Sequence, residues 1–146
     1  MIGFAQLIRT VVFSHFGEDG KQRHFNIDLL TLMVKAAMDK GLMDVLDVQI
    51  DPGFAENCLV YRGIEQHRLD RIDVHYFQTP LFFCENVATE NTHLLVDGHH
   101  RYVWAWQQGW ETVPAVSIPQ LAWERVLIPL PDMDKDATVN SFSGIR

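Results

Sequence analysis

The stretch HLLVDGHHRYVWAWQQGWETVPAVSI, residues 93–118, carries the strongest structural signal in the sequence. Its first four residues are mostly apolar and β-favouring, and Asp97-Gly98 directly after them indicates a buried strand that ends in a sharp turn. The pattern is then helical as far as Gly109, which suits the left-handed residue after a helix. Residues 113–118 are again apolar and predict a returning strand. The stretch therefore predicts a strand-turn-helix-strand unit.

The start of this helix has the chemistry of an anion site. A helix that begins directly after Gly98 presents unpaired backbone N–H groups and a partial positive charge. His99, His100 and Arg101 add two imidazoles and a guanidinium at the same place. Gly98 lets the backbone approach a ligand closely, and Arg101 offers a planar fork that matches phosphate or carboxylate oxygens. We expect a phosphate-binding site at Gly98, His99, His100 and Arg101, with an ordinary turn glycine and a structural ion pair of Arg101 as the alternatives.

Three residues around this site are candidates for more specific roles. Adjacent helical residues point about 100° apart, so only one of the two histidines is expected to face a ligand, and we choose His100 as a catalytic residue. Asp97 is the second catalytic candidate, as a Mg²⁺ ligand or a proton acceptor, and a turn or capping role is its alternative. Trp104 faces differently from its helical neighbours and is a candidate for stacking on a nucleobase.

The motif Asp97-Gly98-His99-His100-Arg101-Tyr102, followed by Trp104-Ala105, Gly109 and Val113-Pro114-Ala115-Val116, resembles the glycine-x-x-arginine signature of the ParB/sulfiredoxin-like superfamily. The resemblance implies an α/β (α+β) single-domain fold, with a mixed sheet around the strand-turn-helix-strand unit, and a phosphate cradle at the turn. The superfamily includes ParB nucleotide-binding domains, sulfiredoxins, ADP-dependent serine kinases and ParB-like nucleases. It therefore implies no single reaction.

The sequence departs from individual members of this superfamily. Sulfiredoxins have their reactive cysteine where this chain has His99, so sulfinic acid reduction is not expected. The serine kinases use a glutamate base from the early part of the chain, and Glu18, Glu56 and Glu65 match it by position only. Partition-type ParB proteins continue into helix-turn-helix and dimerisation domains, for which we expect no room in this chain.

Three functional hypotheses follow from these observations. The first is a small phosphotransfer or phosphohydrolase enzyme that binds a nucleotide, or another phosphorylated small molecule, together with Mg²⁺. The second is a ParB-like nuclease or nucleic-acid-binding module, for which the sequence offers scattered cations: Lys21, Arg23, Arg62, Arg68 and Arg71. The third is a non-catalytic interaction domain, such as an inhibitor or adaptor.

The length and net charge of the chain limit the number of domains and the partners that we expect. At 146 residues it is long enough for one domain with a hydrophobic core, which we expect to span residues 1–130. Residues 131–146 are too polar to bury much apolar surface, so we expect a flexible C-terminal tail. The formal net charge of −7 argues against a broad basic face for duplex DNA.

The cysteine, histidine and apolar patterns limit the cellular compartments and the metal cofactors that we expect for this protein. Cys58 and Cys84 are far apart and follow no secretory signal, so we expect free thiols and a cytoplasmic location. No run approaches the roughly 20 apolar residues of a membrane span, so we expect no membrane contact. The seven histidines lack the spacing of a zinc site. Homo-oligomerisation is left open.

Outside the central unit the predictions are local. Apolar residues recur at helical spacing over residues 29–37, after Asn26 or Asp28 as a cap, and Gly41 ends the pattern. A polar run over residues 64–72 predicts a short surface helix. Strands are predicted at residues 7–13, 45–50, 58–61, 73–78, 81–87 and 126–130, and residues 21–24 are predicted to be a solvated loop.

Overall fold

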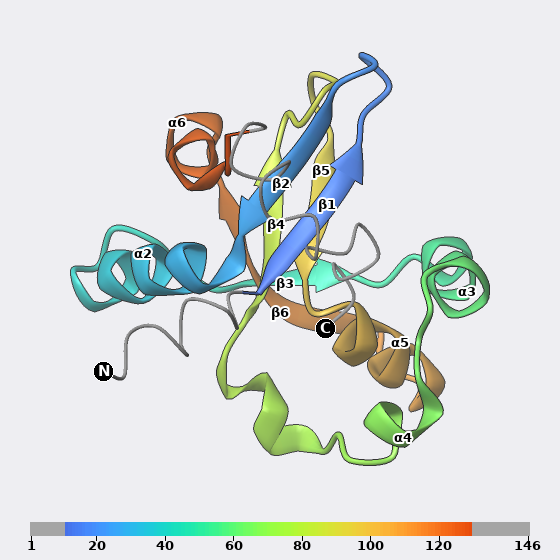
Figure 1. Ribbon diagram of the computed structural model, residues 1–146. Helices are drawn as coiled ribbons and strands as arrows, with labels where there is room; N and C mark the ends of the chain where they lie inside the picture. The colour runs from blue at the N-terminus through green and yellow to red at the C-terminus, as the bar shows by residue number, and fades with distance from the viewer. Residues whose placement is uncertain (1–10, 130–146) are drawn as a thin grey trace, which may run out of the picture.

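The computed structural model of the protein describes residues 11–129, which form six strands in two sheets (Figure 1). The strands are β1 (Val12–Phe16), β2 (Gln22–Asn26), β3 (Leu46–Gln49), β4 (Leu81–Glu85), β5 (His93–Asp97) and β6 (Thr112–Ile118). The main sheet has the order β3-β6-β4-β5, and β1 and β2 form a separate antiparallel hairpin. β4 and β6 are parallel, whereas both outer pairs are antiparallel.

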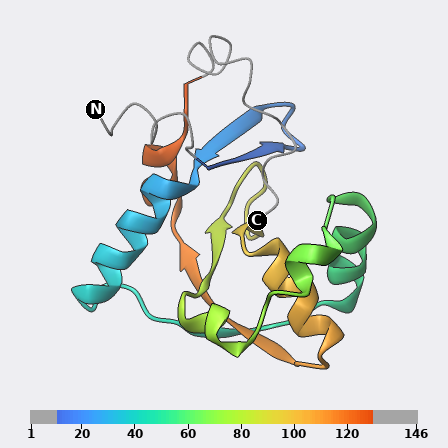
Figure 2. The ribbon, with the colours of Figure 1, turned by 60° about the horizontal axis from the view of Figure 1, so that its bottom comes forward.

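Helices cover both faces of the main sheet. They are α2 (Ile27–Asp39), α3 (Pro52–Tyr61), α4 (Gln66–Leu69), α5 (His99–Gln107) and α6 (Gln120–Trp123), with the 3₁₀ turns η1 (Val74–Gln78) and η2 (Glu124–Val126). In Figures 1 and 2, α2 and α6 lie on one side of the sheet, and α3, α4 and α5 lie on the other. This arrangement confirms the predicted mixed α/β class.

The central strands alternate between two hydrophobic clusters. Phe82 packs in the cluster that contains α2 and the hairpin, whereas its neighbour Leu81 packs in the cluster that contains α5. On β6, Val116 and Ala115 divide between the same two clusters. Because successive side chains of a strand point to opposite faces, a strand that is covered on both sides reads as a continuous apolar run.

The predicted strand-turn-helix-strand unit is confirmed as β5, Gly98, α5 and β6. Gly98 is the N-cap of α5 and has a φ of 109°, a left-handed conformation that favours glycine. A Cβ atom at this position would lie 2.6 Å from Cγ of Leu81, which is buried in the sheet. Only glycine therefore permits both the turn and the contact between the turn and β4.

Three predicted elements were wrong. Residues 22–24 belong to β2 and pair with β1, rather than forming a loop. Residues 58–61 lie in α3, because Asp51 caps that helix with its carboxylate and Pro52 occupies the first turn. Residues 74–78 form η1, with the Asp73 carboxylate accepting the N–H of His75. Strand pairing in the hairpin overrode the polar pattern of residues 22–24, and helix caps overrode the apolar patterns of the other two segments.

Two further predictions were borne out only in part. Residues 45–50 contain β3, but Leu46 is 51% exposed because β3 is an edge strand of the sheet. Near residue 127 there is a single bridge to β2 rather than a strand. The start of the predicted strand at residues 7–13 and the predicted tail at 131–146 lie outside the described residues.

Substitution of Gly98 tests the constraint at the turn. Gly109 is a matched control, because its φ is +83° but nothing lies within 4 Å of an added Cβ. We expect Gly109→Ala to lower the free energy of unfolding by about 1 kcal/mol through backbone strain alone. Gly98→Ala should lower it by about 3 kcal/mol, because overpacking against Leu81 adds to the strain. Equal losses in urea denaturation would show that the close contact is unimportant.

Candidate functional site

A cavity of about 440 Å³ lies where the predicted anion site meets the segment before β4. Its lining residues come from α2, the α4 to η1 segment and the β5–α5 turn: Thr31, Arg68, Arg71, Ile72, Tyr76, Thr79, Asp97, Gly98, His100 and Arg101. Four of the predicted site residues are thus brought together, namely Asp97, Gly98, His100 and Arg101. His99 and Trp104 do not line this cavity.

The cavity concentrates positive charge on an acidic chain. Three guanidinium groups line it, those of Arg68, Arg71 and Arg101, and Asp97 is the one carboxylate among its lining residues. Sequence reasoning treated Arg68 and Arg71 as scattered cations. Their spacing of three residues, which places side chains on one side of a helical turn, was the signal that could have grouped them. A local excess of cations attracts an anion even when the net charge is negative.

Arg101 makes structural contacts at the floor of the cavity. One terminal nitrogen donates to the backbone carbonyl oxygens of Tyr76 and Thr79, at 3.1 Å for Tyr76. The other lies 3.5 Å from a carboxylate oxygen of Asp97. Both charged side chains are largely buried, with 13% and 8% of their surfaces exposed. The ion pair considered for Arg101 is therefore present, and the guanidinium ties η1 to α5.

Asp97 does not provide a magnesium site within the protein. Its side chain is buried and shares its charge with Arg101. Within residues 11–129, no group of three or more histidine, cysteine or acidic side chains is placed to hold a metal ion. Mg²⁺ normally binds through one or two carboxylates that remain accessible to water and to substrate oxygens. The residues at this site do not fit a resident Mg²⁺.

His100 contacts the chain segment that carries the other two arginines. Its side chain is 2% exposed, and Nε2 accepts a hydrogen bond from the backbone N–H of Glu65 at 3.2 Å. In this contact the ring is neutral at Nε2, because a protonated nitrogen cannot accept. Nε2 is thus already used in a contact with the backbone.

His99 lies in the core. It is fully buried, its ring stacks on Phe13 with 5.2 Å between ring centroids, and neither ring nitrogen has a hydrogen-bond partner among the described residues. Burial, followed by the nearby Arg62 and His100, lowers the pKa of His99 to about 3. A charged imidazole would lose hydration without gaining an acceptor, so the folded state keeps His99 neutral.

Trp104 packs within an aromatic cluster rather than presenting a free face. Its ring centroid lies 5.6 Å from that of Phe77 and 5.4 Å from that of Trp110. The aromatic side chain that does line the cavity is Tyr76, which is 48% exposed. Sequence reasoning missed Tyr76 because residues 73–78 read as a strand.

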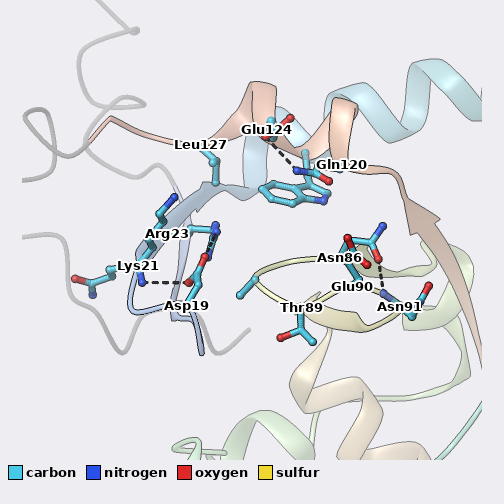
Figure 3. Close-up of a pocket in the computed structure, with 13 residues that line it drawn as sticks. Asp19, Lys21, Arg23, Asn86, Thr89, Glu90, Asn91, Gln120, Glu124 and Leu127 are labelled. Atoms are coloured by element: carbon cyan, nitrogen blue, oxygen red, sulfur yellow. Dashed lines mark hydrogen bonds and ion pairs between the residues drawn. The ribbon is translucent and has the colours of Figure 1, made fainter.

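A second, larger groove of about 690 Å³ lies between the β1–β2 turn, the β4–β5 loop and α6 (Figure 3). Arg23 is held there by Asp19 through two bonds, the shorter at 2.6 Å, and this contact lowers the pKa of Asp19 to about 2. Lys21 faces a groove that also contains Glu90 and Glu124. Three carboxylates, those of Asp19, Glu90 and Glu124, line this groove with only two cations, so it lacks the positive excess of the smaller cavity.

The two cysteines do not contribute reactive thiols. Cys58 and Cys84 are both free and buried, as expected for unpaired cysteines. Burial raises the pKa of Cys58 to about 11 and raises that of Cys84 as well. The thiolate is the nucleophilic form, so a raised pKa disfavours nucleophilic chemistry at either residue.

Comparisons with known proteins give no match: no protein-family model, no curated protein and no solved structure is similar to this chain at a significant level. Among residues 11–129, no helix has the length and apolar character that a membrane span requires.

Substitution of Arg101 tests its structural contacts in the absence of any ligand. We expect Arg101→Ala to lower the free energy of unfolding by about 3 kcal/mol, because it removes a cation beside the buried Asp97 carboxylate and the hydrogen bonds to two backbone carbonyls. Arg71→Ala is the matched control, since Arg71 is exposed and should change stability by no more than about 0.5 kcal/mol. Equal unfolding midpoints in urea for Arg101→Ala and the wild type would contradict this reading.

The buried His99 predicts a loss of stability on acidification. Its pKa is about 3 when folded and near 6.5 when unfolded, so between these values the unfolded chain binds more protons. Stability is therefore complete above pH 6.5 and falls by about 1.4 kcal/mol per pH unit below it, or about 2 kcal/mol between pH 7 and pH 5. Urea denaturation at both pH values measures this loss.

The matched variants for this measurement are His99→Phe and His75→Gln. His99→Phe keeps an aromatic ring against Phe13 and should remove most of the pH dependence. His75 is 77% exposed, so His75→Gln should keep the wild-type dependence. A wild-type pH profile in His99→Phe would show that another group is responsible.

Proposed function

We propose that this protein binds a phosphorylated small molecule, such as a nucleotide, in the cavity at the start of α5. The observation that carries the proposal is the convergence of Arg68, Arg71 and Arg101 on one cavity of a chain with a net charge of −7. Guanidinium groups match phosphate oxygens in geometry and remain charged at all physiological pH values. The left-handed turn at Gly98 and the helix that follows it add to the same preference for anions.

The likeness of residues 97–102 to the glycine-x-x-arginine signature supports the same ligand class. We extend the proposal to the fold and infer a ParB/sulfiredoxin-like domain. The proposal is for binding rather than for phosphotransfer. Asp97 and His100, the two expected catalytic residues, are both buried, and each makes a contact that holds the walls of the cavity together. A general base must reach the substrate proton directly or through one water, whereas both of these groups are already engaged in contacts within the protein.

The distribution of cations favours a small ligand over nucleic acid. Lys21 and Arg23 line the other groove, where Arg23 is paired with Asp19. Arg62 lies over the ring of Phe13, 5.9 Å from its centroid. None of these three cations lines the cavity that Arg68, Arg71 and Arg101 share, whereas binding to a nucleic acid backbone depends on contacts with successive phosphates.

Isothermal titration with pyrophosphate and ATP tests the anion site. We expect both to bind, and Arg71→Gln to weaken both about tenfold, because a charge-assisted contact is worth about 1.5 to 3 kcal/mol. Lys21→Gln is the matched control: it also removes one exposed cation, but from the second groove. Equal weakening by the two variants would reveal non-specific attraction, and no binding by the wild type would refute the proposal.

Tyr76 tests whether the ligand is a nucleotide. Its exposed ring lies at the cavity, and stacking of a base on an aromatic side chain contributes about 1 to 3 kcal/mol. We expect Tyr76→Ala to weaken ATP at least about fivefold and to leave pyrophosphate affinity unchanged. The backbone carbonyl that Arg101 uses is retained in this variant. Equal affinities of the variant and the wild type for ATP would exclude stacking on Tyr76.

A further inference from the structure

The segment that carries Arg68 and Arg71 has little local stability of its own. α4 has four residues, and its N-cap Glu65 makes no side-chain capping bond. In a capping box, the side chain of the third helical residue accepts the N–H of the N-cap residue. The third residue of α4 is Arg68, and a guanidinium group cannot accept a hydrogen bond. Helices of this length are not stable by themselves, so tertiary contacts must hold α4 in place.

His100 supplies the acceptor that α4 lacks. Its Nε2 accepts the N–H of Glu65 at 3.2 Å, across 35 residues of sequence. One turn further along α5, Val103 packs with Leu69 and Ile72 in a buried cluster. Residues three apart on a helix lie on the same face, so His100 and Val103 together form the surface on which the α4 segment rests.

The positions of Arg68 and Arg71 depend on this contact between the α4 segment and α5. Arg68 lies one residue before Leu69, and Arg71 lies one residue before Ile72, and both arginines line the cavity. The packing of Leu69 and Ile72 holds the segment against α5, and a directional hydrogen bond fixes where it begins. Burial alone is non-directional, so the bond from Glu65 to His100 contributes a directional contact to the placement of the arginines.

We propose that His100 is a positioning residue, which accepts the Glu65 N–H and thereby holds Arg68 and Arg71 at the cavity for binding of an anion with several charges. This inference rests on the proposed function, because it explains how the cavity acquires two of its three cations. It replaces the catalytic role expected for His100. The same helix start then supplies Arg101 directly and the other two arginines indirectly.

The variants are chosen to separate the hydrogen bond from packing. His100→Leu keeps a side chain of similar bulk but has no acceptor. His100→Gln places an amide oxygen near the position of Nε2 and should rescue the bond. If His100 only fills the core, His100→Leu should disturb the segment less than His100→Gln does. If its role is to accept the hydrogen bond, His100→Gln should disturb the segment less.

The first readout is hydrogen exchange of the full-length protein without ligand. We expect the amides of residues 65–72 to exchange at least tenfold faster in His100→Leu than in the wild type, while β4 and β6 are unchanged. His100→Gln should restore most of the protection. Unchanged exchange of residues 65–72 in His100→Leu would overturn the inference, whatever the protein binds.

The second readout is pyrophosphate affinity, measured by titration in a double-mutant cycle with Arg71→Gln. We expect His100→Leu to weaken pyrophosphate about tenfold in the wild-type background and by a smaller factor when Arg71 is already replaced, because only Arg68 then remains to be positioned. Equal weakening in both backgrounds, or none in either, would overturn the positioning role while Arg71→Gln still supports the site. If wild type does not bind pyrophosphate, the proposed function fails and the hydrogen-exchange result alone decides whether His100 holds the segment.

Discussion

The close contact between Gly98 and Leu81 is the constraint on which the arrangement of this protein depends. β5 must reverse into α5 directly above β4, and the space between the turn and the Leu81 side chain is too small for a Cβ atom. With glycine in the left-handed conformation, α5 begins at once and buries Tyr102 and Ala105 against the sheet. The same turn places Asp97 and Arg101 four residues apart and in contact. The fold and the cavity thus share one origin.

The residues of the motif divide their work between structure and binding. Arg101 ties η1 to α5 through two backbone carbonyls, and it also contributes one of the three positive charges of the cavity. His100 joins the α4 segment to the same helix, whereas His99 fills the core beside Phe13. The residues of a short motif therefore do not all bind the ligand, even when the motif marks the binding site. The backbone conformation decides the direction of each side chain of the motif. His100 and Arg101 therefore line the cavity, whereas His99 does not.

Charge in this protein is organised locally rather than globally. The acidic total of −7 coexists with a cavity lined by three arginines and one aspartate. In the larger groove, Asp19 holds Arg23, and the carboxylates outnumber the cations by three to two. Because interactions between exposed charges are screened over about 8 Å in physiological salt, the nearest neighbours determine what a site attracts. The net charge describes the behaviour of the whole molecule towards large polyanions.

The sequence by itself determined the strand-turn-helix-strand unit, the helix capped by Asn26 and the mixed α/β class, because turn glycines, caps and apolar periods act within a few residues. It also placed Asp97, Gly98, His100 and Arg101 at one site. It could not place Tyr76, Arg68 and Arg71 there, nor show that His99 is buried. The first three placements depend on how residues 65–79 pack against α5, more than 20 residues further along the chain, and the burial of His99 depends on its stacking against Phe13. Only the tertiary structure decided them, because long-range contacts leave no local pattern.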